Sequence, residues 1–137
     1  MRRFLLLLPL LLLTACVPSR EEADSKLADA CQAEIKATLD AKESITVGKA
    51  SYAFAKSYDG AGLRVVTLDA KYTSGDNEPE NKTYTCSYTE EWSFFSYLPE
   101  FYNLQKGDEK FGNVNGTITG DTNILVKIND ATENVLH

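Results

Sequence analysis

The chain has 137 residues, with 14 lysines and arginines against 20 aspartates and glutamates, which gives a formal net charge of −6 at pH 7. This acidic balance argues against nucleic-acid binding, which needs clustered basic side chains, and against electrostatic attraction to anionic lipid head groups. The length suits a single domain and is too short for two, and no internal repeat divides it.

The first element is an apolar run, Phe4 to Leu13, which follows Arg2 and Arg3. It is about ten residues long, whereas a helix that crosses a bilayer needs roughly 20. A basic start, a short apolar run and a small residue, Ala15, form the layout of a secretory signal peptide. The sequence therefore predicts that residues 1–15 are a signal peptide, which is cleaved off and forms no part of the folded domain.

The end of this leader, Leu13-Thr14-Ala15-Cys16, resembles the lipobox of bacterial lipoproteins. The resemblance covers the leader alone and implies that Cys16 is diacylglycerated on sulfur. After cleavage Cys16 would also receive an amide-linked fatty acid such as palmitate, and two or more acyl chains hold a protein stably on a membrane. Val17 rather than Asp follows Cys16, which by analogy implies sorting to the outer membrane, facing the periplasm.

A helix is expected directly after a short lipidated tether, residues 16–20, so that one domain spans 21–137. Ser19 and Glu22 fit the capping box that starts a helix. Apolar residues then recur at intervals of three and four: Ala23, Leu27, Ala30, Cys31, Ile35 and Leu39. This is the stripe of an amphipathic helix, whose charged residues are expected on its other faces: Glu21, Asp24, Lys26, Asp29, Glu34 and Lys36.

Strands are predicted next. Ile45 and Val47 alternate, and the phase then slips at Gly48 so that Tyr52 and Phe54 share a face, which is typical of a bulge. A second strand in 63–73 places four apolar side chains on one face, namely Val66, Leu68, Ala70 and Tyr72. A polar, acidic loop in 74–81 is expected to project before the third strand, 82–90.

Cys31 and Cys86 are the two cysteines left after Cys16 is lipidated. In the third strand Tyr84, Cys86 and Tyr88 alternate with polar residues and are expected to face the core. Cys31 lies on the apolar stripe of the helix, so a helix packed on the sheet would bring the two thiols together. Because the periplasm favours oxidation, we expect a Cys31–Cys86 disulfide, with two free buried thiols as the alternative.

The remainder of the chain begins with a dense aromatic segment, which contains Trp92, Phe94, Phe95, Tyr97, Phe101 and Tyr102. We expect it to be a crossover that is partly core. Short strands and turns follow around Gly107, Gly112 and the pair Asn115-Gly116, and a helix capped by Asp121 ends the chain. The expected fold is α+β, in which the N-terminal amphipathic helix packs on a small antiparallel sheet and a C-terminal helix follows.

Sequence motifs for catalysis are missing. The one histidine, His137, is the last residue, so it is poorly placed to serve as an oriented general base, and no nucleophile-elbow, P-loop or zinc-ligand spacing occurs. Asp76 to Glu80 could offer oxygen ligands to Ca²⁺ but lacks the spacing of an EF-hand. We therefore expect no enzyme activity, no metal and no cofactor, and a carboxylate-dependent hydrolase is the weakest of the alternatives.

Two functions from different classes stay open. The first is a protein-interaction module of the cell envelope, whose partner-binding candidates are the aromatic side chains of 92–102 together with the acidic loop 75–81. The second is a carrier or sensor of a small apolar ligand held between helix and sheet. A roomy cavity lined by Tyr52, Phe54, Val66 and Leu68 would favour the carrier, and an exposed aromatic patch on a filled core would favour the module.

Overall fold

The computed structural model describes residues 17–137. The leader 1–15 and Cys16, with the lipobox predicted there, lie outside the described residues. Two helices enclose six strands in the order of the chain: α1 (Arg20–Ala37), β1 (Glu43–Lys56), β2 (Gly62–Ser74), β3 (Glu80–Trp92), β4 (Tyr97–Lys106), β5 (Glu109–Val114), β6 (Thr117–Thr119) and α2 (Thr122–Leu136). Within these residues no helix is long and apolar enough to span a bilayer.

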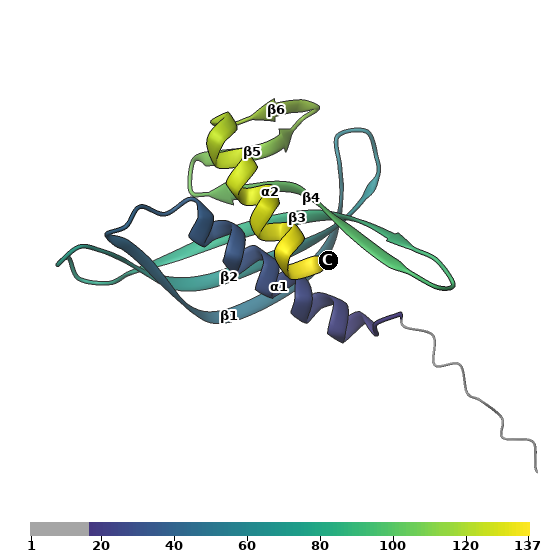
Figure 1. Ribbon diagram of the computed structural model, residues 1–137, viewed down its shortest axis with the longest axis horizontal. Helices are drawn as coiled ribbons and strands as arrows, with labels where there is room; N and C mark the ends of the chain where they lie inside the picture. Colours follow the sequence, from purple (N-terminus) through teal and green to yellow (C-terminus); the bar gives the residue numbers. More distant parts are fainter. Residues whose placement is uncertain (1–16) are drawn as a thin grey trace, which may run out of the picture.

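The strands form one antiparallel sheet in which each strand pairs with the next in sequence (Figure 1). The pairing of β1 with β2 shifts register between Val47 and Lys49, which confirms the bulge predicted at Gly48. Between β5 and β6 lies the predicted Asn115-Gly116 turn, in which both residues have positive φ, 51° and 85°. Such φ values are those of the tight hairpin turn that matches the twist of its strands.

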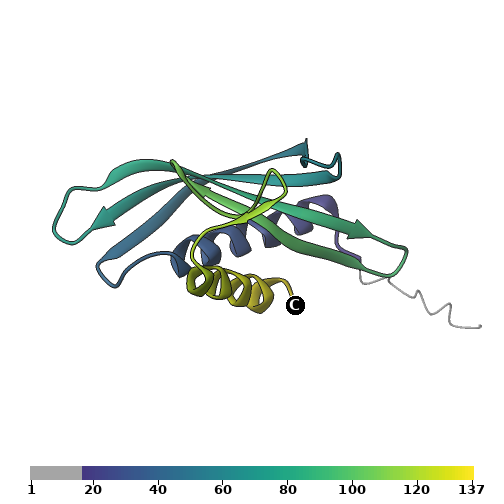
Figure 2. The same ribbon diagram turned by 90° about the horizontal axis from the view of Figure 1, so that it is seen from above.

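Both helices pack on the same face of the sheet and against each other (Figure 2). Their apolar side chains form one core with those of the strands. Leu27 and Ile35 from α1, Leu68 and Leu104 from the sheet, and Ile128 from α2 are all almost fully buried. The structure thus confirms the α+β class, with an N-terminal and a C-terminal helix over one antiparallel sheet.

The helix starts are those predicted. Ser19 caps α1, its hydroxyl accepting a hydrogen bond of 3.2 Å from the Glu22 amide. Asp121 caps α2, its carboxylate accepting from the amides of Asn123 and Ile124 at 2.9 and 3.2 Å. A capping side chain of this kind stabilises a helix by about 1 kcal/mol.

The predicted disulfide is present. It joins Cys31 of α1 to Cys86 of β3 across a Cα–Cα distance of 5.7 Å, and both cysteines are fully buried. The bridge closes a loop with a sequence separation of 55 residues. In the chain-entropy model such a loop stabilises the folded state by about 4 kcal/mol. The disulfide therefore fixes α1 on the centre of the sheet.

Candidate functional site

The aromatic segment is a hairpin rather than the expected crossover. Trp92 is the last residue of β3 and Tyr97 the first of β4, and they pair across the strands with ring centroids 4.2 Å apart. The Tyr97 hydroxyl donates a hydrogen bond to Glu90. Burial, and then this carboxylate, raise the pKa of Tyr97. Hydrogen bonds that involve the side chains of Ser93 and Ser96 close the turn between the strands. This turn lacks the glycine or asparagine that tight hairpin turns usually contain.

The six aromatic side chains predicted to bind a partner divide into two groups. Trp92, Phe94 and Phe95 are exposed, with 42%, 88% and 82% of their surface accessible. Tyr97, Phe101 and Tyr102 are half-buried, and Phe101 packs against the core. The segment is therefore partly core and partly surface, and its exposed part is the end of the β3–β4 hairpin.

A cluster of aromatic and arginine side chains, which shares Trp92 with the hairpin, lies on the sheet face that carries the helices. It comprises Tyr52 and Phe54 of β1 and Trp92 of β3, together with Arg20 of α1 and Arg64 of β2, and is here named the aromatic–arginine cluster. The Arg64 guanidinium lies 4.2 Å from the centroid of the Phe54 ring and 5.9 Å from that of Tyr52. Arg20 lies 5.3 Å from the Trp92 ring and 5.9 Å from Phe54. These are cation–π distances.

Two carboxylates hold the arginines of the cluster in place. Arg64 donates two hydrogen bonds to Asp24, at 2.9 and 2.6 Å, and Arg20 donates two to Glu90, at 2.9 and 2.8 Å. Arg20 also lies 2.6 Å from Asp24. Burial alone would raise the pKa of Asp24, but the hydrogen bond from Arg64 and the charges of both arginines outweigh it and lower that pKa.

The expectation that Asp24 and Glu34 lie on the solvent side of α1 is wrong, because both are buried. Their spacing from the apolar stripe could have shown this, since Asp24 precedes Leu27 by three residues and Glu34 follows Cys31 by three. Arg64, missed as well, is in phase with the inward-facing side chains of its strand. The burial of these three ionisable residues was therefore missed, although the helix and the strand that carry them were predicted correctly.

Glu34 is a buried carboxyl among neutral partners. The hydroxyls of Tyr88 and Thr132 lie 2.8 Å from its Oε1 atom, and Oε2 has no hydrogen-bond partner. Burial raises the pKa of Glu34 to about 8, against the opposing effect of these two hydrogen bonds. The Tyr88 hydroxyl can also donate to the Leu27 carbonyl at 3.4 Å, and the Thr132 hydroxyl to the Ile128 carbonyl at 2.9 Å. Because a hydroxyl that donates elsewhere can still accept, a protonated, neutral Glu34 can donate a hydrogen bond to one of them.

The acidic loop does not join the aromatic surface. It lies between β2 and β3, at the far end of β3 from the aromatic hairpin, and the two lie at opposite ends of the sheet in Figure 1 and Figure 2. Because β3 has 13 residues, about 40 Å separate them. The two predicted halves of one partner surface are therefore two separate surfaces.

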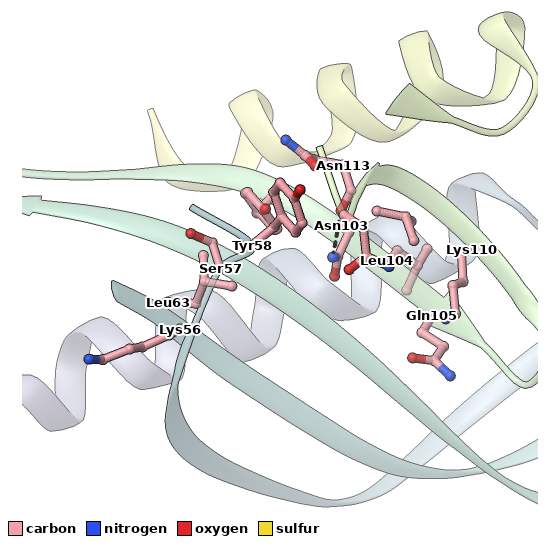
Figure 3. A pocket seen from close by; sticks show the side chains of 12 residues that line it. Lys56, Ser57, Tyr58, Leu63, Asn103, Leu104, Gln105, Lys110 and Asn113 are labelled. Carbon is pink, nitrogen blue, oxygen red and sulfur yellow. Dashed lines mark hydrogen bonds between the residues drawn. The ribbon is translucent and has the colours of Figure 1, made fainter. Parts of the chain in front are cut away.

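A pocket of about 190 Å³ lies between the β1–β2 turn and strands β4 and β5 (Figure 3). Lys56, Tyr58 and Lys110 line it with polar neighbours that include Asn103 and Asn113, and no carboxylate contributes. The Asn103 amide donates to the Asn113 carbonyl at 2.8 Å. The hydrogen-bond donors around this pocket suit a small hydroxylated or anionic molecule. Of the residues predicted to form a site, only Tyr102 lines this pocket.

Metal binding finds no support in the described residues, since 17–137 contain no group of three or more His, Cys, Asp or Glu side chains placed to hold an ion. Comparison with known proteins finds no family, no curated protein and no solved structure that matches this chain.

Proposed function

We propose that this chain is a non-enzymatic, lipid-anchored lipoprotein of the bacterial envelope, held at the outer membrane on its periplasmic side, and that it acts as a protein-interaction module. The support for the anchor is the lipobox-like end of the leader, Leu13 to Cys16. Because Ser19 already caps α1, only Val17 and Pro18 separate it from Cys16. The domain would therefore lie directly on the membrane surface.

The aromatic–arginine cluster is the observation that carries the proposed interaction. Phe54 exposes 71% of its surface although the alternation of its strand turns it toward the helix side. Phe54, Trp92 and Tyr52 lie around the same two arginines and together form an aromatic edge. Tryptophan, tyrosine and arginine are the residues that most often dominate the binding energy of protein interfaces. This surface has that composition.

The geometry of the cluster also favours binding at a low entropic cost. Arg20 and Arg64 are held by Glu90 and Asp24 before any partner arrives, so fewer side chains would lose freedom on association. The charges of these four residues balance, which leaves the aromatic rings as the principal contacts. We propose that the partner presents an apolar segment to this edge.

The filled core favours the module over the carrier of an apolar ligand. Val66 and Leu68, expected to line a ligand cavity, are buried in the cluster of side chains that joins α1 to the sheet. Tyr52 and Phe54 lie on the same face of the sheet but outside the cover of the helices, so both are exposed. The non-enzymatic character is supported by the sequence, in which no nucleophile-elbow, P-loop or zinc-ligand spacing occurs.

A photo-cross-linking experiment in cells tests the proposal. A benzophenone amino acid replaces Phe54 in the full chain, and Val126, an exposed apolar residue of α2, serves as the control position. We expect one discrete adduct from position 54 in the membrane fraction and none from position 126. The adduct should weaken severalfold with Trp92→Ala, which removes part of the same edge, and persist with Ile118→Ala.

The proposal is wrong if positions 54 and 126 give the same pattern, or if the adduct at position 54 is insensitive to Trp92→Ala. Ile118 is as exposed as Phe54 but lies on β6, so its substitution controls for a general loss of surface apolarity.

A further inference from the structure

The turn between β3 and β4 presents two phenylalanines to solvent at the end of the hairpin. Phe94 and Phe95 are the most exposed of the large apolar side chains in residues 17–137, and their ring centroids lie 5.8 Å apart. No charged residue occurs between Trp92 and Leu98. In Figure 1 the hairpin extends beyond the rest of the sheet. The domain itself leaves both phenylalanines uncovered, because 88% and 82% of their surfaces are accessible. An exposed, uncharged aromatic projection of this kind is typical of sites that contact a membrane or a protein partner.

Several polar groups of this turn are paired within it. The Ser93 amide donates to the Ser96 carbonyl at 2.9 Å, and the Ser96 amide donates to the Ser93 hydroxyl at 3.0 Å. The two hydroxyls are hydrogen-bonded to each other at 2.6 Å. In an apolar medium an unpaired backbone group is costly because no water replaces its partner. The turn can therefore enter such a medium without breaking these bonds.

The chain enters the fold beside the same hairpin. The bidentate pair of Arg20 with Glu90 joins the first residue of α1 to the base of the hairpin. In Figure 1 and Figure 2 the start of α1 and the β3–β4 turn lie at the same end of the molecule. Cys16 precedes Ser19 by three residues, so it stays within about 10 Å of Ser19 in any conformation.

We propose that the turn Ser93–Ser96 inserts the side chains of Phe94 and Phe95 into the bilayer that holds the Cys16 lipid. The inference rests on the acylation of Cys16, which belongs to the proposed function. Trp92 and Tyr97, whose rings meet at a tilt of 39° at the base of the turn, then lie at the level of the head groups, where these two residue types are enriched in membrane proteins. Insertion proceeds through apolar side chains rather than charge, because the domain is acidic.

A second point of attachment fixes the orientation of the domain. A lipid on a flexible tether leaves a protein free to rotate, whereas a lipid and an inserted turn together define one face toward the membrane. The acidic loop at the other end of β3 then points away from the bilayer, into the periplasm. The aromatic–arginine cluster lies beside the inserted turn, close to the membrane surface.

Trp92, the only tryptophan of the chain, provides the test. The acylated protein is reconstituted into phosphatidylcholine vesicles with and without brominated acyl chains, which quench tryptophan at bilayer depth. The variants are Phe94→Ser with Phe95→Ser, and Tyr58→Ser as a control on an exposed aromatic residue in another turn. We expect quenching in the native chain and the control to exceed that of the double variant about twofold or more.

Added salt, or anionic lipid in place of phosphatidylcholine, should leave the quenching unchanged. Equal quenching in the native chain and the double variant would overturn the proposal. An absence of quenching in the native chain would do the same, and so would an intact mass that shows no acyl groups. Since both phenylalanines are exposed, the double variant should keep the cooperative unfolding of the native chain, and this is checked first. Equal or absent quenching in an acylated chain defeats this inference alone and leaves the cross-link from position 54 unaffected, whereas a mass without acyl groups defeats the lipid anchor of the proposed function as well.

Discussion

Replacement of Glu34 by glutamine should remove most of the dependence of stability on pH between about 5 and 7. Glu34 is fully buried, and burial raises the pKa of its carboxyl to about 8 in the folded chain. The ordinary value, in the unfolded chain, is 4.5. Between these two values the folded state retains a proton that the unfolded state releases. The substitution supplies a neutral side chain of the same shape at every pH.

The sign follows from this difference in bound protons. The contribution of Glu34 to the free energy of unfolding is fully present below pH 4.5 and is lost as the pH rises toward and through 8. Each pH unit within this window lowers the free energy of unfolding by about 1 kcal/mol. From pH 5 to pH 7 the native chain should therefore lose about 2 kcal/mol through this group.

Urea unfolding of the disulfide-bonded chain at pH 5, 6 and 7, followed by Trp92 fluorescence, measures the effect. Glu91→Gln is the matched control, because Glu91 is an exposed glutamate of β3. We expect the Glu34→Gln variant to lose most of the pH dependence and the control to retain it. If Glu34→Gln and the native chain show parallel decreases between pH 5 and 7, Glu34 is ionised in the folded state and the reasoning is refuted.

Two further substitutions test the other buried interactions. Asp24→Asn leaves the buried Arg64 guanidinium without a counter-charge, so it should lower the free energy of unfolding by about 3–5 kcal/mol in the same urea titration. A loss below about 1 kcal/mol would show that solvent reaches Arg64. Cys86→Ser removes the disulfide and should cost about 4 kcal/mol, which lowers the midpoint of thermal unfolding by more than about 10 °C. Reduction of the native chain is the control, and a midpoint unchanged by both treatments would contradict the chain-entropy estimate.

Periodicity predicted the two helices, the first three strands and most of the apolar side chains that face the core. The alternation of Tyr84, Cys86 and Tyr88 and the stripe that carries Cys31 were enough to predict the disulfide, because each pattern fixes a direction relative to the backbone. The bulge at Gly48 and both helix caps are equally local features. Features of this kind, which depend on a few neighbouring residues, could be predicted from the sequence.

The part of the sheet that the two helices cover could not be predicted in the same way. The phase of β1 places Tyr52 and Phe54 on the helix side, but β1 is the edge strand and the helices leave this end of it open. Which part of a face is covered depends on where distant elements pack, and alternation carries no such information. The turn at Ser93–Ser96 was missed because it contains no glycine, asparagine, aspartate or proline, and the two serine side chains alone mark it as a turn.

The contact between α1 and α2 joins the first and last elements of the domain, whereas each strand pairs with its neighbour in the chain. A chain that is made from its N-terminus can complete the sheet and the Cys31–Cys86 bridge before α2 has emerged. Until then Glu34 lacks the cover of Thr132 and remains hydrated. When α2 docks last, its docking is the step at which the chain takes up a proton at neutral pH, and a pH indicator can time that step in a refolding experiment.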